Sequence, residues 1–166
     1  YYIKIYVMNF LKISIGIFLV LAVSRFIPHP PNFTSLIALS FYIPIIMGLK
    51  FIPVLIFCFF VTDYFIGFHS TTFFTWGSIL IIGLISQYFK KNIYVRLLGA
   101  LSASLVFYLF SNFGVWSLGS YSYTFDGLIL CYIAAIPFYT NTLLSTIIYS
   151  VIIESIIGFY KKFKFI

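Results

Sequence analysis

Long apolar runs, separated by short polar turns, fill nearly the whole of this 166-residue chain. Hydrophobic residues make up 63% of the sequence and charged residues only 8%. A soluble domain carries roughly 25–35% charged residues on its surface, so this chain has too few to face water on all sides. Each run is close to the ~20 residues that a membrane-crossing helix needs. The sequence therefore predicts an integral membrane protein.

Prolines, glycines and basic residues divide the apolar runs into six predicted membrane spans. The expected spans are residues 8–25, 33–48, 51–68, 73–89, 95–115 and 139–160. Pro28, Pro30 and Pro31 forbid a continuous helix after the first span, and Asn32 can cap the second. We therefore expect an all-α fold, in which six transmembrane helices form a single transmembrane domain over residues 1–166.

The segment between the fifth and the last span differs from the rest of the chain. A turn-rich stretch around Gly119 and Asp126 leads into a short apolar piece, residues 128–136, which ends before Pro137. At about 1.5 Å per residue this piece is too short to cross a bilayer. It is predicted to be a re-entrant or interfacial helix that precedes the last span.

The first seven residues of the chain do not resemble the natural start of a protein. The chain begins with YYIKIYV, and the stretch from Met8 to Lys12 resembles an initiation site followed by an apolar run. We therefore expect residues 1–7 to be an added or processed extension. No small-x-small cleavage site precedes the proline-rich stretch, so the first span is expected to stay in the mature protein.

Basic residues are distributed unequally between the two ends of the predicted spans. One end carries only Arg25, and the other carries nine: Lys4, Lys12, Lys50, Lys90, Lys91, Arg96, Lys161, Lys162 and Lys164. In membrane proteins the cytoplasmic loops carry the excess of Lys and Arg. Both termini are therefore predicted to be cytoplasmic. This topology explains the basic loops better than nucleic-acid binding does, so no nucleic acid is expected as a partner.

Two ionised residues at the outer end have more than one interpretation. Arg25 is a headgroup anchor, a structural partner of Asp63 or Asp126, or the counter-ion of an anionic ligand. Asp63 lies in an apolar run, where it either faces the bundle interior or caps the end of its helix. These alternatives differ in whether the charges serve the fold or a ligand.

Further polar and aromatic residues gather at the same end. Asn112 can hydrogen-bond a ligand or hold neighbouring helices together, while Trp76 and Trp116 can stack on a planar ligand or belong to the interfacial belt. The hypothesis is an outward-facing pocket for a small polar nutrient, in which Arg25 holds a carboxylate or phosphate. The expected ligand-binding residues are Arg25, His29, Asn32, Asp63, Asn112, Trp116 and Asn141.

Patterns typical of catalytic, metal and cofactor sites do not occur in this sequence. The histidines and acids lack metal-ligand spacing, and Cys58 and Cys131 form no CxxC pair. No glycine-rich phosphate loop, nucleophile elbow or paired carboxylates occur either. We therefore expect no catalytic residues, no metal and no cofactor, and energy from ATP would come from another chain. Glu154 is expected to pair with Lys50 or Lys161.

Several stretches resemble a family of uncharacterised bacterial integral membrane proteins, and the resemblance covers residues 8–159. They are residues 24–34, 62–67, 111–116, 127–128 and 134–142. That family is similar, more distantly, to the substrate-binding S components of energy-coupling-factor vitamin transporters. The resemblance implies six helices, an outward-facing pocket with the loop after the first helix in its lid, and a place in the bacterial cytoplasmic (inner) membrane.

The resemblance also implies partners, because S components work with a transmembrane coupling subunit and two ATPases. The chain is therefore expected to be an S-component-like protein that binds a small, polar, vitamin-like molecule for uptake, and not an enzyme. The competing expectation is a structural or accessory subunit of a larger membrane complex, whose aromatic surfaces pack against other subunits. In either case the lipid bilayer surrounds the chain.

Overall fold

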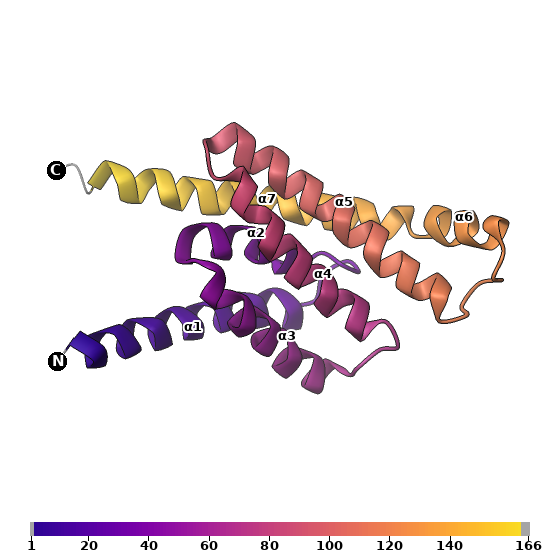
Figure 1. Ribbon diagram of the computed structural model, residues 1–166, viewed down its shortest axis with the longest axis horizontal. Helices are drawn as coiled ribbons and strands as arrows, with labels where there is room; N and C mark the ends of the chain where they lie inside the picture. Colours follow the sequence, from indigo (N-terminus) through magenta and orange to yellow (C-terminus); the bar gives the residue numbers. More distant parts are fainter. Residues whose placement is uncertain (1, 164–166) are drawn as a thin grey trace.

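The computed structural model describes the backbone of residues 2–163 and the side chains of residues 7–160 and 162 (Figure 1). Every regular element in this part of the chain is helical, which confirms the predicted all-α fold. The α-helices are α1 (Tyr2–Phe26), α2 (Leu36–Met47), α3 (Ile52–Ile66), α4 (Thr72–Ile85), α5 (Ile93–Ser117), α6 (Phe125–Ala134) and α7 (Ile136–Phe163). Short 3-10 turns lead into α3 (Leu49–Phe51) and out of α4 (Ser86–Phe89).

Five of the predicted spans are long and apolar enough to cross a membrane. They are Val7–Phe26, Leu49–Ile66, Thr72–Phe89, Ile93–Ser117 and Ile136–Tyr160. The last begins before residue 139 because Pro137 occupies the second position of α7, where no helical hydrogen bond needs its missing N–H. The short helix expected at residues 128–136 is α6. It begins at Phe125 because the Thr124 hydroxyl caps it, accepting a hydrogen bond from the Gly127 N–H at 3.1 Å.

The predicted second span, residues 33–48, is not confirmed as a membrane crossing. α2 has 12 residues, and at 1.5 Å per residue it extends about 18 Å, against about 30 Å for the hydrocarbon core of a bilayer. Asn32 adopts a left-handed backbone conformation with φ of 64°, which together with the prolines before it keeps residues 27–35 out of the helix. Gly48, with φ of 95°, ends α2.

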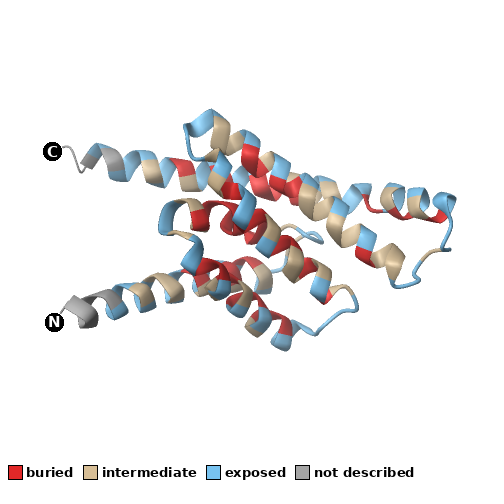
Figure 2. Ribbon diagram, in the orientation of Figure 1, coloured by how far each residue is buried: buried red, intermediate tan, exposed pale blue. Residues whose placement is uncertain are grey.

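Although it is short, α2 lies at the centre of the bundle. It contacts α1, α3, α4, α5 and α7, and every residue from Leu36 to Tyr42 is buried. Figure 2 shows the buried residues concentrated on α2 and on the neighbouring stretches of α3 and α4. The outer faces of the long helices expose large apolar side chains instead, as helices surrounded by lipid do.

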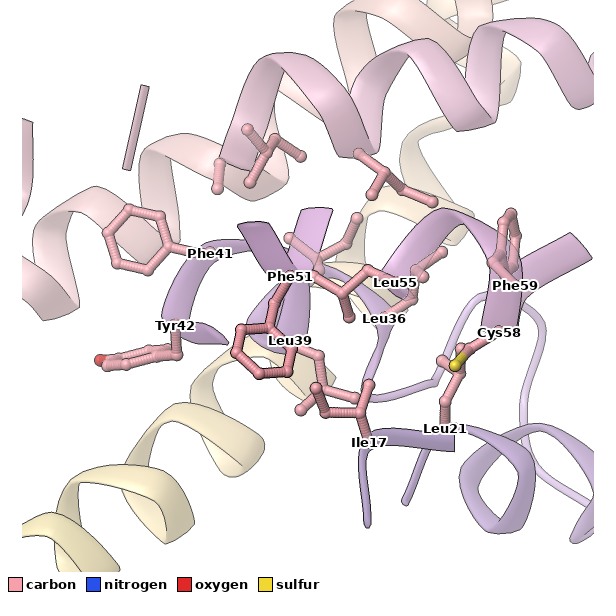
Figure 3. Close-up of a cluster of buried hydrophobic side chains, with 14 of the residues drawn as sticks. Ile17, Leu21, Leu36, Leu39, Phe41, Tyr42, Phe51, Leu55, Cys58 and Phe59 are labelled. Carbon is pink, nitrogen blue, oxygen red and sulfur yellow. The ribbon is translucent and has the colours of Figure 1, made fainter. Parts of the chain in front are cut away.

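The apolar core joins α1, α2, α3 and α4, together with Ala100 and Ala103 of α5 (Figure 3). Ile17 and Leu21 of α1 lie against α2 and α3, where Leu39, Leu55 and Cys58 meet them. Leu21 and Leu55 are completely buried. This core gives the α1–α4 half of the bundle a fixed shape, against which α5 and α7 pack, while α6 packs on α5 and α7.

The start of α1 and the end of α7 lie at the same end of the molecule (Figure 1). An ion pair joins α5 to α7 near this end: Nε and Nη2 of Arg96 each donate to a carboxylate oxygen of Glu154 at 2.6 Å. The sequence predicted Lys50 or Lys161 as the partner of Glu154. The prediction missed Arg96, and the Lys161 side chain lies outside the described residues.

Candidate functional site

A cavity of about 490 Å³ lies toward the opposite end of the bundle from the start of α1 and the end of α7. Its walls come from the end of α1, the α1–α2 loop, the first residues of α2 and α4, the second half of α3 and of α5, the end of α6 and the start of α7. The α3–α4 loop adds His69 and Thr71, and the α5–α6 loop adds Tyr121. Sites for small molecules have volumes of roughly 300–1,000 Å³ and combine apolar walls with a few polar groups. The size and the position of this cavity make it the candidate site.

The late start of α2 is what gives this end of the bundle its polar loop. Because the helix begins only at Leu36, residues 27–35 cross the end of the bundle as irregular chain, and His29, Asn32 and Thr34 line the cavity. The loop is fixed at its base, where the Ser24 and Ser35 hydroxyls are 2.7 Å apart and both buried.

Four of the seven predicted site residues line the cavity: Arg25, His29, Asn32 and Asn112. The sequence placed them correctly at one end because each follows or ends an apolar run. Asn112 lies on the second half of α5, and its side-chain N–H donates to the Tyr108 carbonyl one turn earlier at 2.7 Å. Its side-chain oxygen stays available as an acceptor.

Asn141 and Trp116 do not line the cavity, but each fixes a loop that does. The Asn141 side chain donates to the Pro31 carbonyl at 3.0 Å, which ties α7 to the loop that carries His29 and Asn32. The indole N–H of Trp116 donates to the Ser122 carbonyl at 3.0 Å, next to Tyr121 in the cavity wall. The structure therefore gives both residues a positioning role, and it places the Trp116 ring outside the cavity.

Asp63, the remaining predicted residue, is the partner of Arg25. Its Oδ1 lies 2.7 Å from Nη2 of Arg25, and its Oδ2 accepts a hydrogen bond from the indole N–H of Trp76 at 3.2 Å. The Arg25 guanidinium also donates to the Thr62 hydroxyl and lies over the Phe59 ring, 4.2 Å from its centroid. Asp63 is fully buried, so structural pairing, one of the interpretations left open by the sequence, is what the structure shows.

Helix α6 closes the cavity on the side away from α1. The Tyr108 hydroxyl on α5 donates to the Tyr132 carbonyl at 2.6 Å, and the Tyr132 hydroxyl donates to the Leu109 carbonyl at 2.8 Å. The Cys131 thiol donates to the Asn112 carbonyl at 3.4 Å. These three bonds hold the α6 backbone along the second half of α5.

The sequence reasoning missed the aromatic and hydroxyl residues of the cavity wall. Those on α5 and α7 are Phe107, Tyr108, Ser111, Phe138, Tyr139 and Thr142. A signal for them existed: on each helix they recur three or four residues apart, so they share one helix face. In a chain this rich in Phe and Tyr, a face of that kind is hard to distinguish from a lipid-facing one.

Hydrogen bonding and aromatic contact are the chemistry that this wall offers. Within the described part of the chain, Arg25 is the only Arg, Lys, Asp or Glu that lines the cavity. In the same residues no three His, Cys, Asp or Glu side chains come together as metal ligands, and Cys58 and Cys131 are free thiols.

One family model matches the chain, that of a family of unknown function (DUF6580), and the match covers residues 7–165. No curated protein and no solved structure matches the chain. The similarity to S components of vitamin transporters therefore stays a prediction from the sequence.

Proposed function

Because the chain belongs to the family of unknown function DUF6580, we propose its role from the cavity: it binds a small polar molecule for uptake across the membrane. In this proposal the protein acts like the S component of a transporter, as the sequence led us to expect. The observation that carries the proposal is the cavity of about 490 Å³, whose wall combines aromatic rings with convergent polar side chains.

The position of the cavity supports an outward opening. The turns between α2 and α3 and between α4 and α5, which carry Lys50, Lys90 and Lys91, lie toward the same end as the start of α1 and the end of α7 (Figure 1). By the positive-inside rule that end faces the cytoplasm. The cavity, at the other end, then faces the outside of a bacterial inner membrane, where a nutrient arrives.

Uptake against a gradient needs energy, and this sequence contains no phosphate-binding loop. We therefore propose a membrane coupling subunit with ATPases as partners of the chain. The exposed apolar faces of the long helices offer room for such contacts.

Filling the cavity tests the proposal. Ala134 lines the cavity but is exposed, so a Trp there can enter the space without displacing the core, whereas the neighbouring Ile133 is exposed and does not line it. Native mass spectrometry of protein purified from its own membrane should find a small molecule retained by the wild type and by Ile133→Trp. We expect Ala134→Trp to lose it, with at least about a hundredfold lower occupancy, because the ring takes its place.

Two results would count against uptake. Equal retention by Ala134→Trp and Ile133→Trp would place the bound molecule outside the cavity. A wild-type chain without any small molecule, held at fixed stoichiometry in a larger assembly, would favour the structural subunit expected as the alternative.

A further inference from the structure

Hydroxyl groups deep in the cavity donate their protons to the helices that carry them. The Ser111 hydroxyl donates to the Phe107 carbonyl at 2.7 Å, and the Thr142 hydroxyl donates to the Phe138 carbonyl at 3.0 Å. Thr75 on α4 does the same toward the Thr71 carbonyl at 3.3 Å. A hydroxyl has one donor and two lone pairs, so each of these groups has acceptor capacity left for a ligand but no donor.

Two nitrogen-bearing side chains of the wall add further acceptors. One N–H of Asn112 is used on the Tyr108 carbonyl, which leaves its second N–H as a donor and its amide oxygen as an acceptor. The Nδ1 atom of His29 lies 2.7 Å from the Pro30 carbonyl oxygen. A carbonyl oxygen only accepts, so Nδ1 carries the proton, and the neutral ring then offers Nε2 as a further acceptor.

Positive charge in the wall is already neutralised. Asp63 and Arg25 form a closed pair, and the pair has further partners in Thr62 and Trp76. At the start of α2 the Ser35 N–H donates to the Ser24 hydroxyl and the Leu36 N–H donates to the Thr34 hydroxyl. An incoming carboxylate or phosphate would therefore have to share the guanidinium with Asp63.

Aromatic rings complete the wall. Tyr108 and Tyr139 are paired with ring centroids 4.7 Å apart, and Phe107 and Phe138 lie beside them in the lining. The faces of such rings attract planar groups and cations. Side chains with donors that have no partner among the described residues also line the cavity: Asn32, His69, Thr71 and Tyr121 in the loops and Tyr139 on α7. The acceptors of the wall are concentrated in the back-bonded hydroxyls of Thr75, Ser111 and Thr142.

From these observations we infer that the cavity selects a planar ligand rich in hydrogen-bond donors, with an amino or amidine nitrogen group, over a carboxylate or phosphate. The inference rests on the proposed function, because it names the ligand class of that site. It replaces the earlier hypothesis that Arg25 holds an anionic group.

Three bicyclic probes of equal shape test the inference: 2-naphthamidine, 2-naphthamide and 2-naphthoate. They differ in carrying a cationic donor group, a neutral amide or an anionic acceptor group. Their affinities for the purified full chain in detergent can be measured by equilibrium dialysis. We expect the amidine to bind best and the carboxylate at least about tenfold more weakly, since a hydrogen bond from a charged donor is stronger than one from a neutral donor.

Variants of single lining residues test whether the probes bind to the hydroxyls of the cavity wall. Ser111→Ala and Thr142→Val remove acceptors with little change of shape, and each should weaken amidine binding about fivefold. The controls Ser102→Ala and Ser155→Ala remove hydroxyls that make the same backbone bond on exposed faces of α5 and α7, and should leave binding unchanged.

The possible outcomes separate the inference from the proposed function. Preferred binding of 2-naphthoate, lost in Ala134→Trp, would overturn the ligand class and leave the cavity as the binding site. Failure of all three probes to bind, in a chain that also retains no small molecule from its membrane, would overturn both.

Discussion

Replacing Asp63 with alanine is expected to lower the free energy of unfolding by about 3–5 kcal/mol, because it leaves a buried charge without its partner. The Arg25 side chain is only 10% exposed and the Asp63 side chain is completely buried. The substitution also removes the acceptor of the Trp76 indole. Equilibrium unfolding in mixed micelles measures the loss.

Two further variants distinguish the loss of the Arg25–Asp63 charge pair from the loss of the hydrogen bond to Trp76. The double variant Arg25→Met with Asp63→Asn removes both charges but keeps an acceptor for Trp76, and we expect it to recover most of the lost stability. Asp126→Ala is the matched control, since this acid is exposed in the first turn of α6 and its loss should cost at most about 1 kcal/mol. Equal effects of Asp63→Ala and Asp126→Ala would contradict the buried pair.

The same double variant tests what Arg25 does for a ligand. If the pair serves the fold, as its closed contacts indicate, the variant should keep the small molecule that the wild type retains. Loss of that molecule from a stably folded double variant would restore Arg25 as the residue that holds a ligand.

Replacing Glu154 with alanine is expected to cost about 2–3 kcal/mol, because it leaves Arg96 without its two hydrogen bonds. The cost should be smaller than for Asp63, since Arg96 lies at the basic end, where a long side chain can reach the headgroups. Because α2 packs against both α5 and α7, the loss would loosen these three helices together.

A double-mutant cycle with Arg96→Met isolates the pair itself. We expect Glu154→Ala to cost much less in the Arg96→Met background than in the wild type, with Ser155→Ala as the exposed neighbour that changes little. Additive effects of the two substitutions would show that Arg96 and Glu154 do not stabilise the bundle as a pair.

The helices were predictable from the sequence because hydropathy is a local property. Apolar runs, prolines and basic turns located five membrane-length helices and the short α6. Hydropathy could not show where α2 begins, since residues 33–35 are compatible with a helix by composition. Their backbone is instead fixed by turn hydrogen bonds, from the Phe33 N–H to the Pro30 carbonyl and from the Thr34 N–H to the Asn32 carbonyl. The Ser35 N–H also donates to the Ser24 hydroxyl of α1.

Partners across helices were predictable only where the alternatives were few. Asp63 is one of three acids in the chain, so it could be named for Arg25, whereas Glu154 had several basic residues within its half of the bundle. Tyr108, Tyr139 and Thr142 become recognisable as site residues only once α5 and α7 are seen to pack side by side in the cavity wall. No spacing within one helix contains that information.

The most direct measurement is the labelling of single cysteines in intact cells with a membrane-impermeant maleimide. In a chain carrying Cys58→Ser and Cys131→Ser, Ala134→Cys reports the cavity and Lys91→Cys reports the exposed α4–α5 turn at the basic end. We predict that Ala134→Cys reacts from outside, more slowly in the presence of the molecule released from the wild-type protein, and that Lys91→Cys reacts only after lysis. Reaction of Lys91→Cys in intact cells, with Ala134→Cys protected until lysis, would contradict an outward-facing binding site.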